Sequence, residues 1–281
     1  MKVFETIKEV KAHIAGLKKT GKSIGFVPTM GALHRGHIEL IKQARQNNDV
    51  VAVSVFVNPK QFNNPEDLKK YPRDLEKDLG IISEIGCDVV FAPSTEEMYP
   101  GPVAENYYFG DLEETMEGKY RKGHFKGVAI VVKRLFDIIE PDKAYFGKKD
   151  YQQLMVVKKL VEKTGLPVEI VPCETVREPD GLAMSSRNKR LTPQQRKEAP
   201  IIYKSLIKAS RLYPNTPIEQ IKQIITYDIN SMPSLQLEYF EIVDSENLKP
   251  ITSKKAGQKP IACIAVYAGD IRLIDNMIFN D

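Results

Sequence analysis

The sequence predicts an α/β protein with a parallel sheet, followed by a smaller α+β domain. Runs such as 49–59 are apolar at nearly every position, as in strands that are buried on both faces of a sheet. These runs alternate about five times with segments whose apolar residues lie three or four positions apart, the spacing of amphipathic helices. After about residue 176 the pattern changes to helices followed by strands with turn residues between them. We therefore expect domains at residues 1–175 and 176–281.

The first domain should contain strands and helices in alternation. Strands are expected at the apolar runs 23–28, 49–59, 87–93, 143–147 and 166–176. The helical spacing of apolar residues predicts a first helix through Ile7, Val10, Ile14 and Leu17, and further helices at 37–48, 72–86, 123–140 and 151–165. Suitable end signals for three of these helices are Gly86, Pro141 and Gly165. Because ligands of such sheets bind beyond the carboxyl ends of the strands, we expect a site formed by the loops 28–37, 58–62, 147–153 and 177–188.

The second domain should begin with two capped helices. Thr192, Pro193 and Gln195 have the spacing of a capping box with proline at the first helical position. Thr216 and Glu219 repeat this device before the second helix. Strands are expected at the later apolar runs 235–244, 260–268 and 270–277.

Composition and charge indicate a soluble globular protein. The chain has 281 residues and a net charge of +4, with basic residues spread along it, so we expect no nucleic-acid partner. No stretch reaches the ~18 apolar residues of a membrane span, and 1–19 lacks the apolar core of a secretory signal. Cys87, Cys173 and Cys263 lie far apart, which argues against a disulfide framework and a zinc site. We therefore expect a cytoplasmic protein with no membrane association and no metal held by its own residues.

Two of the four histidines, His34 and His37, stand three residues apart where a predicted strand gives way to a helix. A helix N-terminus presents unpaired N–H groups and the positive end of the dipole, and Gly31 and Gly36 allow the backbone to approach a ligand. Imidazoles there are suited to donate hydrogen bonds to phosphate oxygens as charge builds in a transition state. The alternatives are two surface histidines or a metal pair, for which no carboxylate or cysteine is suitably spaced nearby.

Three further loops carry polar side chains that suit a small anionic substrate. Asn58 and Gln61 offer amide hydrogen bonds to hydroxyls or a carboxylate, although the segment could be only a turn forced by Pro59. Residues 147–150 contain Lys148 and Lys149, one of which can neutralise an α-phosphate, and Asp150, which could bind a ribose hydroxyl or cap the helix. Residues 180–188 contain two hydroxyls and an arginine, as in a loop that closes over a triphosphate. Taken separately, such charges are also typical of a solvated surface.

Six motifs in this order resemble those of the pantoate–β-alanine ligase family, also called pantothenate synthetases. They cover nearly the whole chain: PTMGALHRGH (28–37), VFVNPKQF (55–62), YPRD (71–74), RKGHFKGV (121–128), FGKKDYQQ (146–153) and DGLAMSSRN (180–188). The resemblance implies a Rossmann-like sheet of the H-x-G-H nucleotidyltransferase type. It also implies a two-step reaction. ATP first converts the carboxylate of (R)-pantoate into pantoyl-adenylate and pyrophosphate, and the amine of β-alanine then displaces AMP to give pantothenate, a precursor of coenzyme A.

The resemblance further implies roles for residues at matching positions. His37 corresponds to the proton donor, His34 assists at the phosphates, and Lys149 lies near the α-phosphate. Gln61 is expected to bind both pantoate and β-alanine, and Gln153 to bind pantoate. The residues expected to bind ATP are Met30, Gly31, Ala32, Leu33, His34, Arg35, Gly36, His37, Gly147, Lys148, Lys149, Asp150, Val176, Met184, Ser185, Ser186 and Arg187. The domain after residue 175 would then act as a lid.

The resemblance also implies properties that the residues alone do not give. The family is usually a homodimer, and Mg²⁺ is expected with ATP. No metal ligand is assigned, because Asp74 and Asp78 are more typical of the polar face of a helix. Arg35 stands where the family often has an acidic residue, and we expect it to point away from the histidines with little effect on catalysis.

The alternatives share the nucleotide-binding loops. Adenylyltransferases and class I aminoacyl-tRNA synthetases also have an H-x-G-H sequence at a helix start. An adenylyltransferase acting on pantetheine phosphate is typically much shorter, and about 105 residues after the boundary are few for reading an anticodon. A non-catalytic nucleotide-binding regulator would not need Gln61, Gln153 and Lys149 together.

Overall fold

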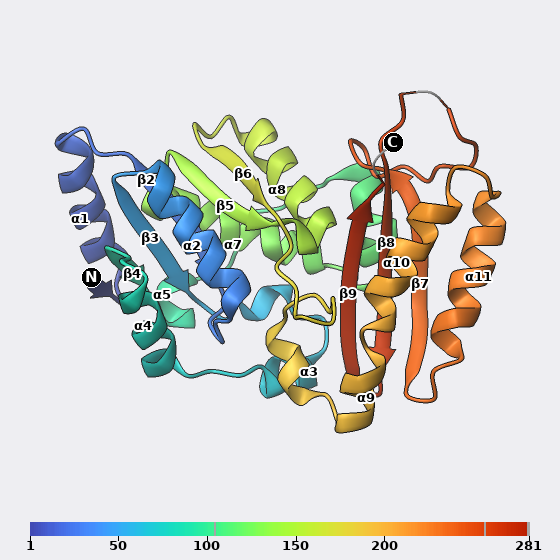
Figure 1. Cartoon of the computed structure of the whole chain (residues 1–281). Coiled ribbons are helices and arrows are strands. Elements are labelled where there is room, and N and C mark those ends of the chain that lie inside the picture. Colours follow the sequence, from blue (N-terminus) through green and yellow to red (C-terminus); the bar gives the residue numbers. More distant parts are fainter. Residues whose placement is uncertain (104, 256, 280–281) are drawn as a thin grey trace. The chain divides into compact units, whose positions relative to one another are not determined.

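The chain divides into two compact units in the computed structural model, which describes residues 1–103, 105–255 and 257–279 (Figure 1). The first unit contains residues 1–148 and 152–174. The second contains residues 149–151 and the described residues from 175 onward. The short segment 149–151 thus belongs to the second unit, although it lies in the sequence between two parts of the first.

The first unit is built on a six-stranded parallel sheet. Its strands are β1 (Lys2–Phe4), β2 (Ile24–Thr29), β3 (Val50–Val55), β4 (Val89–Phe91), β5 (Lys143–Gly147) and β6 (Glu169–Cys173). Their order across the sheet is β1-β4-β3-β2-β5-β6. From β2 the chain adds β3 and β4 on one side of β2, and then adds β5 and β6 on the other side. The point between β2 and β5 is therefore the topological switch point, where open α/β sheets bind their ligands.

Helices cover both faces of this sheet. They are α1 (Ile7–Lys19), α2 (Arg35–Asn47), α3 (Pro65–Lys70), α4 (Leu75–Glu84), α5 (Thr95–Met98), α6 (Met116–Tyr120), α7 (His124–Ile139) and α8 (Tyr151–Thr164), with 3₁₀ turns η1 (Pro59–Gln61), η2 (Gly110–Glu113) and η3 (Lys148–Asp150). Ile41 of α2 and Ile82 of α4 pack with Val27 in one buried cluster. Phe26, the neighbour of Val27 in β2, has its ring 6.3 Å from that of Phe136 in α7. Since adjacent strand residues point to opposite faces, α7 covers the face opposite α2.

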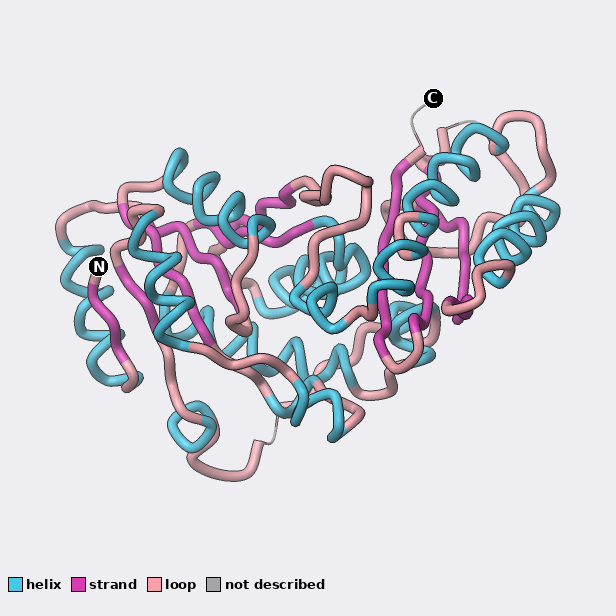
Figure 2. The backbone as a smooth tube through the Cα atoms, turned by 60° about the horizontal axis from the view of Figure 1, so that its bottom comes forward, coloured by secondary structure: helices cyan, strands magenta, loops and turns pink. Residues whose placement is uncertain are grey.

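The second unit has a three-stranded antiparallel sheet of β7 (Leu235–Asp244), β8 (Pro260–Ala268) and β9 (Ile271–Ile278). Its helices are η4 (Ser186–Arg190), α9 (Pro193–Glu198), α10 (Ile201–Leu212) and α11 (Ile218–Asn230). Figure 2 shows α10 and α11 running beside the three strands, and their apolar side chains share one buried cluster with one face of the sheet. The predicted fold class, a parallel α/β sheet with a smaller α+β part, is confirmed.

Two expectations about individual elements are wrong. The sheet has six strands instead of the five expected, because Lys2–Phe4, ahead of the first helix, forms the edge strand β1, which pairs with β4. Thr216 does not cap α11, because Pro217 stands between them with ψ 143° and occupies the cap position itself. The other expected cap, Thr192, is present as a capping box with Gln195.

The cysteines are buried free thiols, and burial raises the pKa of Cys87 to about 12 and that of Cys173 to about 11. Both groups are therefore protonated at pH 8, and protonated thiols are poor nucleophiles. We expect the native protein to react with a thiol-specific disulfide reagent at least ~10-fold more slowly than the urea-unfolded protein does at pH 8. Rapid labelling of Cys87 or Cys173 in the native state, located by mass spectrometry, would contradict this expectation.

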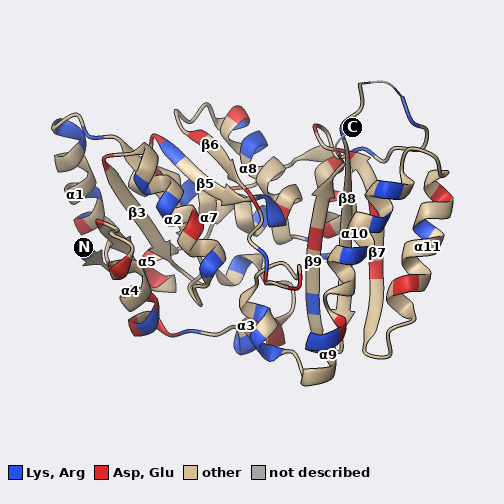
Figure 3. Cartoon of the chain, viewed as in Figure 1, with Lys and Arg blue, Asp and Glu red and all other residues tan. Residues whose placement is uncertain are grey.

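Charged side chains are mixed over both units. Figure 3 shows Lys and Arg interspersed with Asp and Glu on the helices of each unit. Among the described residues, no helix is long and apolar enough to cross a membrane.

Candidate active site

The loop after β2 is held in a conformation that few sequences adopt. Gly31 and Ala32 both have positive φ, at 76° and 52°. The Thr29 hydroxyl donates to the carbonyl of Ser54 (2.7 Å) and accepts from the N–H of Gly31 (3.2 Å). A Cβ on Gly31 would lie 2.7 Å from a carboxylate oxygen of Asp78, so both the backbone angle and the close approach require glycine here.

Asp78 of α4 fixes the next two residues of this loop. Its carboxylate oxygens accept hydrogen bonds from the N–H groups of Ala32 and Leu33, each at 2.8 Å, and its side chain is 2% exposed. The expectation that Asp78 belongs to a polar helix face is therefore wrong. Its carboxylate instead satisfies two N–H groups of the nucleotide loop predicted from the sequence. Asp74 caps α4 by accepting from the N–H of Lys77.

The loop ends in the two histidines, which cap α2 with their imidazoles. Nδ1 of His34 accepts from the N–H of Gly36 (3.1 Å), and Nδ1 of His37 accepts from the N–H of His34 (3.3 Å). A ring nitrogen that accepts a backbone N–H carries no proton, so these partners assign the proton of each neutral ring to Nε2. The ring centroids lie 4.1 Å apart. The predicted anion site thus presents two Nε2–H donors, whereas two of the helix-start N–H groups are already occupied. Arg35 is exposed.

The turn η1 after β3 presents Gln61, which reaches the loop after β2. Nε2 of Gln61 lies 3.0 Å from Sδ of Met30, and the residue is 9% exposed. Asn58 is almost fully buried, and its amide nitrogen donates to Oε1 of Gln61 (3.0 Å) and to the carbonyl of Gly127 (3.1 Å). Its oxygen accepts from the hydroxyl of Tyr99 (2.8 Å). The amide of Asn58 therefore orients Gln61, and its hydrogen bonds go to protein groups and not to the substrate hydroxyls or carboxylate that the sequence suggested.

On the other side of the switch point, β5 ends at Gly147 and is followed by Lys148, which forms an ion pair with Glu174. Gln153, the second expected pantoate ligand, is half-buried on α8. Its neighbour Gln152 is buried and donates to the carbonyls of Leu112 (2.7 Å) and Thr115 (3.0 Å). The first unit thus brings the loops after β2, β3 and β5 to one edge of the sheet, as the sequence predicts.

Lys149 and Asp150 are held within the second unit. The side-chain amide of Asn276 in β9 donates to the carbonyl of Lys149 (2.8 Å), and the Tyr151 hydroxyl donates to the carbonyl of Ser245 (3.0 Å). The Lys149 ammonium is 4.0 Å from the Asp150 carboxylate. The backbone of the expected catalytic lysine is therefore fixed by the C-terminal strand.

The remaining expected ATP residues also lie in the second unit, on a short hairpin. Met184 donates its N–H to the carbonyl of Val176 (3.0 Å), and Arg177 pairs with Ala183. β6 ends at Cys173, so Val176 lies beyond the strand that was expected to contain it. The hairpin continues into η4, where the Ser185 hydroxyl accepts from the N–H of Arg187 (3.3 Å) and Ser186 is buried.

A buried ion pair supports this hairpin. Arg177 binds the carboxylate of Asp275 through both terminal nitrogens, at 2.6 and 3.1 Å, and donates to the carbonyl of Gly181 (3.1 Å). Its guanidinium stacks on the ring of Tyr203, 3.8 Å from the centroid. Asp275 also accepts from the N–H of Asn276 (2.8 Å), so one network joins the hairpin to the residue that holds Lys149.

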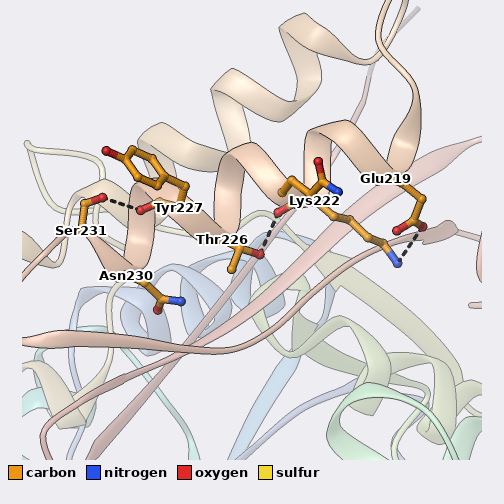
Figure 4. Close-up of a pocket in the computed structure, with 7 residues that line it drawn as sticks. Glu219, Lys222, Thr226, Tyr227, Asn230 and Ser231 are labelled. Carbon is orange, nitrogen blue, oxygen red and sulfur yellow. Dashed lines mark hydrogen bonds and ion pairs between the residues drawn. The ribbon is translucent and has the colours of Figure 1, made fainter.

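A hollow elsewhere on the second unit does not involve these residues (Figure 4). It is lined by α11 and the residue after it: Glu219, Lys222, Gln223, Thr226, Tyr227, Asn230 and Ser231. Several of the polar groups are already used, since Thr226 and Ser231 donate to backbone carbonyls of the same segment and Asn230 accepts from the N–H of Leu237. Among the described residues, no group of three or more His, Cys, Asp or Glu could hold a metal ion.

Comparison with known proteins identifies the family of this chain. The sequence model of the pantoate–β-alanine ligase family matches residues 2–278. Pantothenate synthetases of Christiangramia forsetii and Porphyromonas gingivalis (strain W83) are 50% and 48% identical to this chain, each over the full length of both proteins. The crystal structure of the Thermus thermophilus enzyme superposes with a TM-score of 0.93 at 42% identity, covering all of both chains. That of a Francisella tularensis pantoate–β-alanine ligase, in complex with β-γ ATP and β-alanine, gives 0.81 at 38% identity and covers 99% of this chain and 97% of the other. The chain therefore belongs to the pantoate–β-alanine ligase family, as its six sequence motifs predicted.

Proposed function

We propose that this chain condenses (R)-pantoate with β-alanine through a pantoyl-adenylate, and that the residues described above perform the two steps. The family membership supports the overall ATP-dependent ligation and its place in pantothenate biosynthesis. The observation that carries the residue assignment is the histidine pair at the start of α2, beside the switch point of the sheet, in which each Nδ1 accepts a backbone N–H and so assigns the ring proton to Nε2.

In the first step, a carboxylate oxygen of pantoate attacks the α-phosphorus of ATP, and the bond to the pyrophosphate oxygen breaks. Negative charge grows on the phosphate oxygens as that bond lengthens. Donors that are already oriented stabilise this charge without reorganisation. His37 and His34 supply Nε2–H donors, and Lys149 supplies a positive charge near the α-phosphate. The residues proposed to bind ATP are those of 30–37, 147–150, 176 and 184–187.

In the second step, the amine nitrogen of β-alanine attacks the acyl carbon of the adenylate, and the bond to the AMP oxygen breaks. The nitrogen loses a proton as the amide forms. Gln61 has its amide fixed by Asn58, which suits a residue that contacts both pantoate and β-alanine. Gln153 is proposed as the second pantoate ligand. An amide that is already fixed, as that of Gln61 is, holds the reactants in one orientation, which lowers the entropy cost of their encounter.

Several broader properties are also proposals. Mg²⁺ would enter with ATP, held by its phosphates and water, because the Asp78 carboxylate is occupied by two backbone N–H groups. Residues 1–175 would form the ATP- and pantoate-binding domain and 176–281 the lid. Buried free thiols support a reducing cytoplasmic location. The family resemblance supports a homodimer, which light scattering would test by giving twice the mass of one chain.

The test of this function is exchange of labelled pyrophosphate into ATP, with magnesium and pantoate present and β-alanine absent. A reversible acyl-adenylate predicts exchange that depends on pantoate. Exchange that depends instead on an amino acid would favour a tRNA synthetase-like activity. Absence of exchange with any acid would favour a nucleotide-binding regulator.

Replacement of Gln61 tests the pantoate site. Gln61→Ala removes the amide that Asn58 orients, so we expect the Kd for pantoate to rise ~10-fold or more while the Kd for ATP stays within twofold. Titration calorimetry of each ligand measures both values. Weakened ATP binding with unchanged pantoate binding would contradict the placement of pantoate at Gln61.

A further inference from the structure

A buried histidine lies directly behind Gln61. His124, the first residue of α7, is 5% exposed, and its Nδ1 is 2.8 Å from the backbone carbonyl oxygen of Gln61. A carbonyl oxygen only accepts hydrogen bonds, so Nδ1 carries the proton and donates it. Nε2 lies 3.1 Å from Nη1 of Arg121, and a guanidinium only donates. These two partners assign the neutral tautomer with the proton on Nδ1, opposite to that of His34 and His37.

The first turn of α7 holds η1 at two points. His124 binds the carbonyl at the end of the turn, and the carbonyl of Gly127 accepts from the side chain of Asn58 at its start (3.1 Å). The contact is close, because a Cβ on Gly127 would lie 2.1 Å from the carbonyl oxygen of Lys60. The backbone that carries Gln61 thus rests directly on α7.

The same histidine is connected to α8. Nη1 of Arg121 is 3.5 Å from a carboxylate oxygen of Glu117, which is itself buried. The N–H of Glu117 donates to Oε1 of Gln152 (3.0 Å). Gln152 precedes Gln153, the second proposed pantoate ligand. One chain of polar contacts therefore runs from the backbone of Gln61 through α6 and α7 to the start of α8.

We propose that His124 is a positioning residue for pantoate binding. It acts through Gln61 and sets the distance between Gln61 and Gln153. This inference rests on the proposed function, since it requires Gln61 and Gln153 to bind pantoate. His124 does not need to contact the substrate. It fixes the backbone from which the Gln61 amide projects, and a shift of that backbone changes the contacts of pantoate before those of ATP.

Two substitutions of the same residue separate positioning from packing. In His124→Asn the amide nitrogen can take the place of Nδ1 and keep the bond to the Gln61 carbonyl. In His124→Gln the longer side chain places its amide near the Nε2 position and leaves that carbonyl unpaired. We expect His124→Gln to raise the KM for pantoate ~10-fold or more, with the KM for ATP within twofold. His124→Asn should stay within about threefold of the wild type for both substrates.

A double-mutant cycle distinguishes failure of this inference from failure of the proposed function. The KM for pantoate is measured in the wild type, Gln61→Ala, His124→Gln and the double variant. If His124 acts through Gln61, adding His124→Gln to Gln61→Ala should change this KM less than twofold. Independent, multiplying effects would overturn the positioning role, as would equal loss in the Asn and Gln variants or an equal rise in both KM values. A wild type whose exchange does not depend on pantoate would overturn the proposed function, and the inference with it.

Discussion

Replacing His37 with alanine should slow the adenylation step by roughly 10²–10⁴-fold, the usual scale for a positioned proton donor. The reason is that His37 places its proton on Nε2, because Nδ1 accepts the N–H of His34. The variant loses both the Nε2–H donor and the acceptor that orders the helix start. Single-turnover release of pyrophosphate from ATP in the presence of pantoate, with β-alanine left out, measures this step directly.

Two further variants make the result specific. His37→Gln keeps an N–H donor near the position of Nε2, so it should retain more activity than His37→Ala does. His13→Ala removes a histidine whose ring contacts Phe4 in the N-terminal part of the unit, and its rate should stay within twofold of the wild type. A His37→Ala rate within twofold of the wild type would remove the histidine from the chemistry.

Replacing Asp78 with asparagine should damage both stability and activity, although the residue contacts no substrate in the proposed site. The asparagine amide offers one oxygen where two N–H groups, those of Ala32 and Leu33, need acceptors. A buried N–H left unpaired costs about 1–3 kcal/mol of unfolding free energy. The loop has positive φ at Gly31 and Ala32, a conformation that is not intrinsically favoured. Loss of an acceptor therefore allows the loop to move away from this conformation. A displacement of about 1 Å at the histidines would lower the adenylation rate ~10²-fold.

The same helix provides a matched control. Asp74→Asn makes the identical chemical change at the start of α4, where asparagine is as good a cap as aspartate. Urea unfolding followed by circular dichroism, together with the single-turnover rate, should therefore separate the two variants. Equal behaviour of Asp78→Asn and Asp74→Asn would show that the carboxylate does not hold the loop in the active enzyme.

The sequence predicts those parts of the fold whose signals are local. Continuous Val-rich runs mark β3 and β4, and helical spacing marks α2 and α7, because burial on both faces or on one face imposes these patterns. β1 has no such pattern, since its three residues are mostly exposed and its pairing with Val89 to Phe91 is distant in sequence. A local signal was available in Thr6, whose hydroxyl caps α1 and sets the helix start at Ile7.

Prediction of the site was limited in the same way, because local sequence signals do not show contacts between residues that are distant in the sequence. The residues expected to contact substrate, apart from Val176, lie in the six motifs, so the sequence identifies them. The motifs do not show which residues support them, because Asp78 and His124, although His124 lies in the motif 121–128, act on backbone groups that are 45 and 63 residues away along the chain. The amide group and the position of Asn58 predict a substrate contact, whereas only its burial and its contacts with Gln61 and Tyr99 show that it orients Gln61. The tautomers of the histidines likewise depend on hydrogen-bond partners, which the sequence alone does not identify.

The attachment of Lys149 to β9 has a practical consequence for any shortened or tagged form of this chain. Asn276 lies in β9, and its side chain holds the backbone of the lysine proposed to bind the α-phosphate. Trimming the chain before Asn276, or fusing a partner close behind it, would disturb the adenylation of pantoate without altering any of the six motifs. If a form of the protein that is shortened or fused near Asn276 is inactive, it should therefore be examined first for defective adenylation, and only then for loss of pantoate binding.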